Sequence, residues 1–142
     1  MVCGCSLLQL TNASIGAVAA NSPMPLGVPT QANLCTNGMY VFTSSQNDTV
    51  YITKSGQYRI TYVASLTVAE AGNIVISLVQ NGNVASPLIT TTVTAPAAGT
   101  YNVVLDFVVD VPRGQSWPRY QIYTTGAITG GVSNLIFVPQ GR

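Results

Sequence analysis

Hydrophobic and polar residues alternate along most of the chain from Asp48 onward. The segment 101–111 (YNVVLDFVVDV) has apolar residues at every second position, with Asp106 and Asp110 on the other side. The segment 57–68 (QYRITYVASLTV) has the same pattern, and its apolar side consists of Tyr58, Ile60, Tyr62, Ala64, Leu66 and Val68. A period of two residues is typical of strands with one buried face. Both segments are therefore predicted to be half-buried β-strands.

Shorter segments of the same kind, 73–80 (NIVISLVQ) and 132–138 (VSNLIFV), are separated by turns rich in Gly, Pro and Asn. The Asn81-Gly82 pair is the strongest turn signal, because both residues tolerate a positive φ. We expect about nine strands and no helix. Many short antiparallel strands with such turns indicate an all-β sandwich or jelly roll.

The first 47 residues follow a different pattern. Residues 1–12 are predicted to form an N-terminal arm, and residues 13–142 the jelly-roll domain. Strands are expected around Ala13–Ala20 and Met39–Thr43. The connection 21–34 (NSPMPLGVPTQANL) holds three prolines, which exclude it from a central strand because proline cannot donate to the ladder.

Charged residues are scarce, at 6% of the chain against about 25% in ordinary domains. The net charge is +1, so copies of the chain repel one another weakly. We expect a chain that packs against copies of itself, with an uncharged extracellular domain as the alternative. The five basic residues form no cluster, which argues against a nucleic-acid partner. No apolar run is long enough to predict a membrane span.

The residues do not predict an enzyme. There is no histidine, the commonest general base and metal ligand. Asp106 and Asp110 share a strand face but lie about 13 Å apart along it, too far to share a proton or an ion unless another strand contributes. They are interpreted as solvated carboxylates, with a weak calcium site as the alternative. No catalytic, cofactor-binding or metal-ligating residue is predicted.

The three cysteines, Cys3, Cys5 and Cys35, are the most informative polar groups. Without histidine they cannot fill a four-ligand structural zinc site within one chain. Cys3 and Cys5 share a face in an extended arm. An odd number of cysteines in an oxidising setting favours a bond between chains. The preferred pairing joins Cys3 or Cys5 to Cys35 of a neighbouring subunit, and the alternative is three unpaired thiols in a cell interior.

Several motifs resemble the tumour-necrosis-factor/complement-globular-head superfamily. SGQYRITYVASLTV resembles its Gly-x-Tyr-x-[Ile/Phe]-x-Tyr strand, and VISLVQNGNVA resembles the next strand and its turn. GAVAANSPMPLG resembles the opening of the bacterial members, the C-terminal heads of collagen-like spore-surface (exosporium) proteins, and GGVSNLIFVP takes the place of the last core strand. The resemblance implies a TNF-like jelly roll of two antiparallel sheets in a homotrimer around an apolar axis. It supplies no catalytic residues, and the arm stands where those proteins have a collagen stalk.

Together these features favour a self-assembling structural protein. An arm anchored by Leu7, Leu8 and Leu10 is expected to add a strand to an open sheet edge of the next trimer. Repeated head to tail, this contact gives a fibre. The sequence Ala17–Ala20 resembles a signal cleavage site, but no Lys or Arg precedes it. This favours assembly inside a cell followed by release, as a spore-surface layer or appendage, with a virion as the alternative. A surface anchor protein is a further expected partner.

The competing hypothesis is a trimeric head that binds a receptor or a glycan, as an adhesin or a phage fibre or tail protein. Its candidate ligand patch, Arg113, Trp117, Arg119 and Tyr123, combines aromatic and cationic side chains in and after the segment PRGQSWPRY. The alternative interpretation of Trp117 is a loop residue packed on its own sheet.

Overall fold

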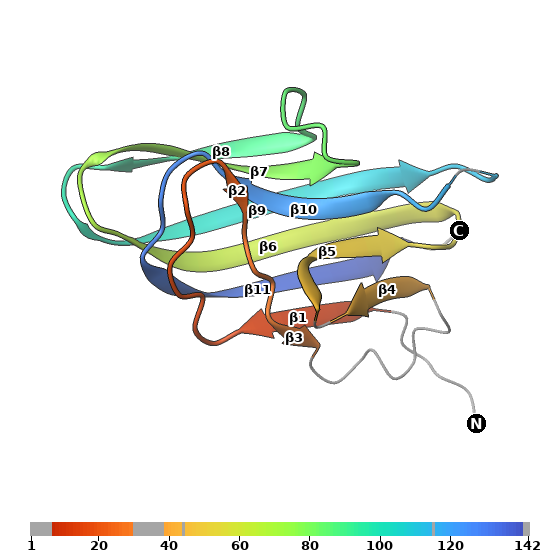
Figure 1. Ribbon diagram of the computed structural model, residues 1–142. Helices are drawn as coiled ribbons and strands as arrows, with labels where there is room; N and C mark the ends of the chain where they lie inside the picture. Colours follow the sequence, from red (N-terminus) through yellow and green to blue (C-terminus); the bar gives the residue numbers. More distant parts are fainter. Residues whose placement is uncertain (1–6, 30–38, 44, 115, 141–142) are drawn as a thin grey trace.

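The computed structural model describes residues 7–29, 39–43, 45–114 and 116–140, which form eleven strands and no helix. The strands form two antiparallel sheets that enclose one hydrophobic core (Figure 1). The first sheet has the order β3-β1-β11-β6-β9. Its strands are β1 (Leu8–Asn12), β3 (Val28–Pro29), β6 (Gly56–Val68), β9 (Gly99–Val111) and β11 (Gly130–Pro139).

The second sheet has the order β4-β5-β10-β7-β8, and β2 also pairs with β10. Its strands are β2 (Ser22–Pro23), β4 (Tyr40–Thr43), β5 (Gln46–Ile52), β7 (Gly72–Gln80), β8 (Ile89–Ala95) and β10 (Arg119–Thr124). Asn81 and Gly82, which follow β7, have φ angles of 56° and 73°. This confirms the turn that the sequence predicts at Asn-Gly.

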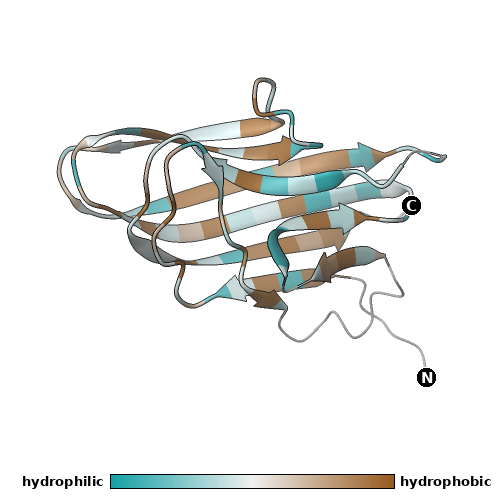
Figure 2. Cartoon of the chain, in the orientation of Figure 1, coloured by the Kyte–Doolittle hydropathy of each residue, from teal (hydrophilic) through white to brown (hydrophobic). Residues whose placement is uncertain are grey.

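The alternation along the long strands is confirmed. Every predicted inward residue of β6 is buried, and the inward residues of β9 are buried or half-buried, while Asp106 and Asp110 are exposed. Figure 2 shows the same alternation as brown and pale or teal segments along the strands. Two antiparallel sheets joined in this way form the predicted all-β jelly roll.

The prediction of an N-terminal arm over residues 1–12 is wrong for its second half. Leu8–Asn12 is β1, which lies between β3 and β11. Leu8 and Leu10 are buried in the domain's own core, so they are not free anchors for a neighbouring trimer. The reason is an alternation of inward and outward positions that places Gln9 and Thr11 on the other face. Leu7 is half-buried just before this strand, and residues 1–6 lie outside the described residues.

The strand expected around Ala13–Ala20 does not form either. Only an isolated bridge between Val18 and Ile128 occurs there. The Asn12 side chain accepts a hydrogen bond from the Ser14 amide at 3.0 Å, and Gly16 has a φ of 74°. Both features replace ladder geometry with a turn.

Buried tyrosines differ in how their hydroxyl groups are satisfied. The Tyr58 hydroxyl donates to the Lys54 carbonyl oxygen at 2.8 Å. The Tyr120 hydroxyl is buried and has no hydrogen-bond partner among the described residues. Burial raises the pKa of Tyr120 to about 12, because the phenolate would lose its hydration.

This difference predicts that the same substitution, Tyr to Phe, changes the free energy of unfolding differently at the two positions. Tyr58→Phe is expected to lower the free energy of unfolding by about 1 kcal/mol, because it removes a hydrogen bond. Tyr120→Phe is expected to leave stability unchanged or slightly increased, because the desolvation of its hydroxyl is not compensated in the native state. Urea unfolding followed by circular dichroism measures both. An equal loss in the two variants would contradict the assignment.

Candidate functional site: an assembly face

Exposed valines gather on one face of the domain. Among the described residues, seven large hydrophobic side chains are exposed, and five of them lie on the outer face of the β3-β1-β11-β6-β9 sheet. We call this surface the assembly face. Its exposed valines are Val28, Val63, Val104, Val108 and Val132. Exposed apolar side chains scattered singly need no explanation, but a group on one flat surface indicates an interaction site.

The register aligns part of this group across the whole sheet. Val104 of β9 lies opposite Val63 of β6, and Val63 lies opposite Asn134 of β11. Asn134 lies opposite Thr11 of β1, which in turn lies opposite Val28 of β3. Directly opposite residues have Cβ atoms about 5 Å apart. The row therefore runs across all five strands with valines at both ends and no charge.

Several neutral polar groups of the assembly face are hydrogen-bonded within it. The Ser65 hydroxyl donates to Asn102 Oδ1 at 2.8 Å, and the Thr11 hydroxyl donates to Asn134 Oδ1 at 2.8 Å. The hydroxyls of Thr67 and Thr100 are 2.9 Å apart, also within hydrogen-bond distance. Polar groups that already have partners lose less when water is removed from them. The assembly face is therefore suited to burial against another surface.

One ion pair lies on the same face. The Arg59 guanidinium donates to both carboxylate oxygens of Asp106, and the Thr61 hydroxyl donates to the same carboxylate at 3.1 Å. The hydrogen bonds from Arg59 hold the pKa of the Asp106 carboxyl below its usual range. The pair is neutral as a unit. The sequence analysis did not pair these two residues, although both stand on the polar sides of the long strands.

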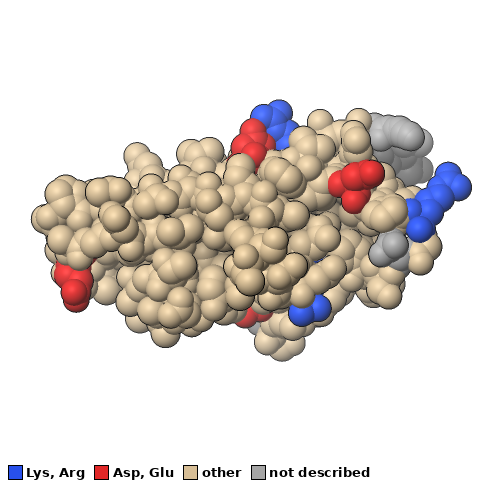
Figure 3. All heavy atoms as spheres, turned by 90° about the horizontal axis from the view of Figure 1, so that it is seen from above, with Lys and Arg blue, Asp and Glu red and all other residues tan. Residues whose placement is uncertain are grey.

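Elsewhere the surface carries little charge. Figure 3 shows a few separated Lys, Arg, Asp and Glu side chains on an otherwise uncharged surface. This agrees with the 6% of charged residues in the sequence.

The structure brings together only part of the predicted ligand patch. Arg113 and Trp117 line one hollow. Arg119 lies over the turn after β7, where a Cβ added to Gly82 would come within 2.8 Å of its guanidinium. Tyr123 is half-buried about 13 Å further along β10, and its hydroxyl donates to the Asn21 carbonyl oxygen at 2.6 Å. The three predicted cross-linking residues, Cys3, Cys5 and Cys35, lie outside the described residues.

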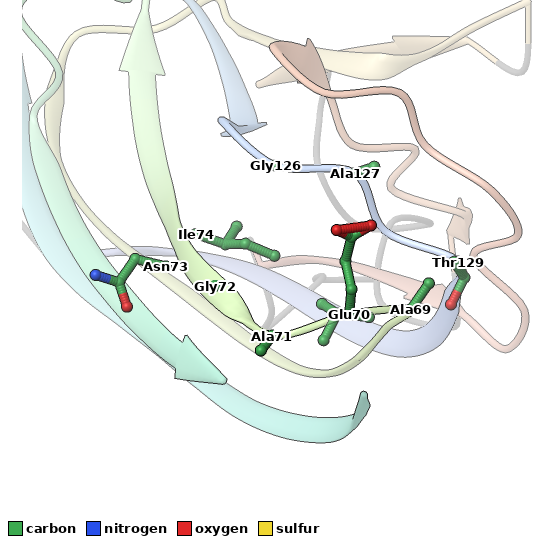
Figure 4. Close-up of a pocket in the computed structure, with 10 residues that line it drawn as sticks. Ala69, Glu70, Ala71, Gly72, Asn73, Ile74, Gly126, Ala127 and Thr129 are labelled. Atoms are coloured by element: carbon green, nitrogen blue, oxygen red, sulfur yellow. The ribbon is translucent and has the colours of Figure 1, made fainter. Parts of the chain in front are cut away.

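A second hollow, of about 220 Å³, lies at the opposite end of the sandwich between the β6–β7 turn and residues 126–129. Figure 4 shows the Glu70 side chain extending towards Ala127, among small and apolar residues. One carboxylate has no second group for acid–base chemistry. Within the described ranges, no three His, Cys, Asp or Glu residues are grouped so as to hold a metal ion. The same part of the chain contains no helix of the length and hydropathy needed to cross a membrane.

No protein-family model matches the chain, and no curated protein matches it in sequence. Solved structures do match it over nearly its whole length. The structure of Eiger TNF from S. frugiperda superposes with a TM-score of 0.73 at 11% identity, covering 96% of this chain and 92% of that chain. The globular domain of zebrafish complement 1qA protein gives 0.70 at 10% identity, covering 96% and 98%. The PRD1 vertex protein P5 gives 0.64 at 14% identity, covering 97% and 99%.

These similarities establish the class of fold. The chain is a TNF-like jelly roll, as the strand motifs of the sequence predict. At 10–14% identity they establish the fold alone.

Proposed function

We propose that the chain is the subunit of a homotrimeric, self-assembling structural protein on an extracellular surface. The observation that carries this proposal is the assembly face, where a row across five strands has valines in three of them and hydrogen-bonded Asn134 and Thr11 in the other two. A second copy of the chain is the occupant that fits best. Among the described residues, its own face carries only Arg59, Asp106 and Asp110 as charged residues, and the chain's net charge of +1 offers little repulsion.

Three copies around an apolar axis agree with the resemblance of the strand motifs to the globular-head superfamily. The fold shared with Eiger TNF and the complement 1qA domain supports the same arrangement. No charge is left unpaired by burying the Arg59–Asp106 ion pair, because each residue satisfies the other.

The proposal extends to polymers of trimers. Residues 1–6, which include Cys3 and Cys5, precede β1 and would reach a neighbouring trimer. Both sheets end in a strand that is paired on one side only within the described residues: β9 with β6, and β8 with β7. Such edges accept an added strand. A disulfide from Cys3 or Cys5 to Cys35 of the next subunit would then make the joint covalent.

We place such a polymer in a spore-surface layer or appendage, because the sequence resembles the heads of collagen-like spore-surface proteins. A surface anchor protein would attach it. A virion is the alternative location, supported by the fold similarity to the PRD1 vertex protein P5.

Truncation of the N-terminus tests the linking role. The cut must end before Leu7, because Leu8 and Leu10 are core residues whose loss would unfold the domain. Full-length protein is expected to give trimers and fibres by mass photometry and negative-stain electron microscopy, and deletion of residues 1–6 is expected to leave trimers only. A Cys3→Ser/Cys5→Ser variant serves as control, with fibres that form but come apart more easily in denaturant. Fibres of normal yield from the truncated chain would refute the linking role, and a monomeric full-length chain would refute the trimer.

A further inference from the structure

Two loops at one end of the sandwich carry an arginine and an exposed tryptophan that the proposed structural role does not use. The β5–β6 loop covers residues 53–55, and the described parts of the β9–β10 loop are residues 112–114 and 116–118. Both lie at the right-hand end in Figure 1. They enclose a hollow of about 360 Å³. We call it the loop hollow, and it is lined by Ile52, Thr53, Ser55, Val111, Pro112, Arg113, Gly114, Trp117 and Pro118.

The walls of the loop hollow are held in place by the sheets. The Ile52 amide donates to the Pro118 carbonyl oxygen at 3.1 Å, and the Thr53 amide donates to the Met39 carbonyl oxygen at 2.8 Å. Pro112 and Pro118 each have a fixed φ angle at the ends of the second loop. Trp117, the single tryptophan of the chain, is nevertheless 55% exposed. An aromatic ring that lines a hollow and is left open to solvent is a surface on which a ligand can stack.

Arg113, which lines the loop hollow with Trp117, forms no ion pair with a carboxylate among the described residues. Arg59 is bound to Asp106, and Lys54, like Arg113, has no ion pair within the described residues. Lys54 stands between two lining residues of the loop hollow. Asp110 lines the neighbouring hollow rather than this one. In a chain with only five Lys and Arg residues, an arginine without an ion-pair partner that lines the same hollow as the single tryptophan offers a site for an anion.

We propose that the loop hollow binds an acidic saccharide, with a sugar ring stacked on Trp117 and its carboxylate held by Arg113. This binding site goes beyond the proposed structural role and does not depend on the trimer. The guanidinium group binds a carboxylate through two parallel hydrogen bonds, which gives orientation as well as affinity. The Ser55 hydroxyl is a donor and acceptor suited to sugar hydroxyl groups. One lining cation is too few for the phosphate backbone of a nucleic acid, so a sugar acid fits better than a polynucleotide.

Tryptophan fluorescence is a site-specific test, because Trp117 is the only reporter. The full-length chain is titrated with sialyllactose, with a uronic-acid tetrasaccharide, with neutral lactose and with sodium sulfate. The two acidic saccharides are expected to change the emission saturably at millimolar concentrations or below, and lactose and sulfate are expected to do so much more weakly. Arg113→Gln is expected to weaken the binding of acidic saccharides by about tenfold or more, because a charged hydrogen-bonded pair is lost.

Arg119→Gln is the matched control, since Arg119 is also exposed and cationic but lies over the turn after β7. It is expected to bind as the unaltered chain does. Trp117→Ala, measured by calorimetry, is expected to abolish binding while the circular dichroism spectrum stays unchanged. No response to any saccharide would overturn the proposal, as would equal affinity for lactose and sialyllactose or equal losses in the Arg113 and Arg119 variants. A response to sulfate equal to that for the acidic sugars would overturn the assignment to a saccharide. Mass photometry of the same samples reports the trimer separately, so failure of one proposal is distinguishable from failure of the other.

Discussion

Replacing Leu10 with alanine is expected to lower the free energy of unfolding by about 3 kcal/mol. Leu10 is fully buried, and it lies opposite Leu135 of β11 in the middle of the first sheet. Truncating such a side chain loses its transfer free energy and leaves a cavity between the sheets. A leucine in a free N-terminal arm would change stability by less than about 0.5 kcal/mol. Urea unfolding followed by circular dichroism therefore decides whether residues 8–12 belong to the core.

Val84→Ala is the control for this measurement. Val84 is 46% exposed in the loop between β7 and β8, so its truncation is expected to have little effect. If Leu10→Ala proved as mild as Val84→Ala, β1 would not be packed in the core. The prediction of an arm over residues 1–12 would then be restored.

The missed strand shows where a pattern of alternation becomes too short to interpret. β6 spans thirteen residues with six consecutive inward apolar positions, so its period of two is unambiguous. β1 offers only Leu8 and Leu10, with uncharged Gln9 and Thr11 opposite, in a segment without a single charge. Its place depends on the ladder to β11, which is more than a hundred residues away in the sequence. The alternation within residues 8–12 shows which side chains share a face, but it does not show which distant strand pairs with them.

The assembly face could be predicted only in part for a similar reason. The alternation correctly placed Val63 and Val104 on the outward sides of their strands. That they lie opposite each other depends on the register, and Val28 joins the row from a proline-rich connection that showed no strand pattern. The Arg59–Asp106 ion pair likewise needs the register of β6 and β9. Outward valines in several strands at once were the signal available in the sequence.

Residues of the predicted ligand patch that are near in sequence are not all near in space. Arg113 and Trp117 stay together because both lie in one short loop. Tyr123 lies four residues beyond Arg119 in β10, where each residue advances about 3.3 Å, so the strand carries it about 13 Å away from the loop. The β5–β6 loop, which completes the loop hollow, is brought in by the tertiary fold.

Replacing Val63 with aspartate is expected to convert the proposed trimer into monomers. Val63 occupies the row of the assembly face, opposite Val104. An aspartate there would bring an unpaired charge into each buried contact, at a cost of about 3–5 kcal/mol per contact. Its side chain is too short to reach solvent past the interface, unlike a lysine. Analytical ultracentrifugation across the micromolar range measures the change in mass.

Val84→Asp provides the matched control, because Val63 and Val84 are equally exposed, at 46%, in the single chain. It is expected to leave the trimer intact. Val63→Thr keeps the shape of the side chain and adds a hydroxyl but no charge, so it is expected to weaken association less than Val63→Asp does. Circular dichroism checks that Val63→Asp still folds, since aspartate is unfavourable within strands. If Val63→Asp and Val84→Asp both remained trimeric, the subunits would meet through a surface other than the assembly face, and the valine row would need a different occupant.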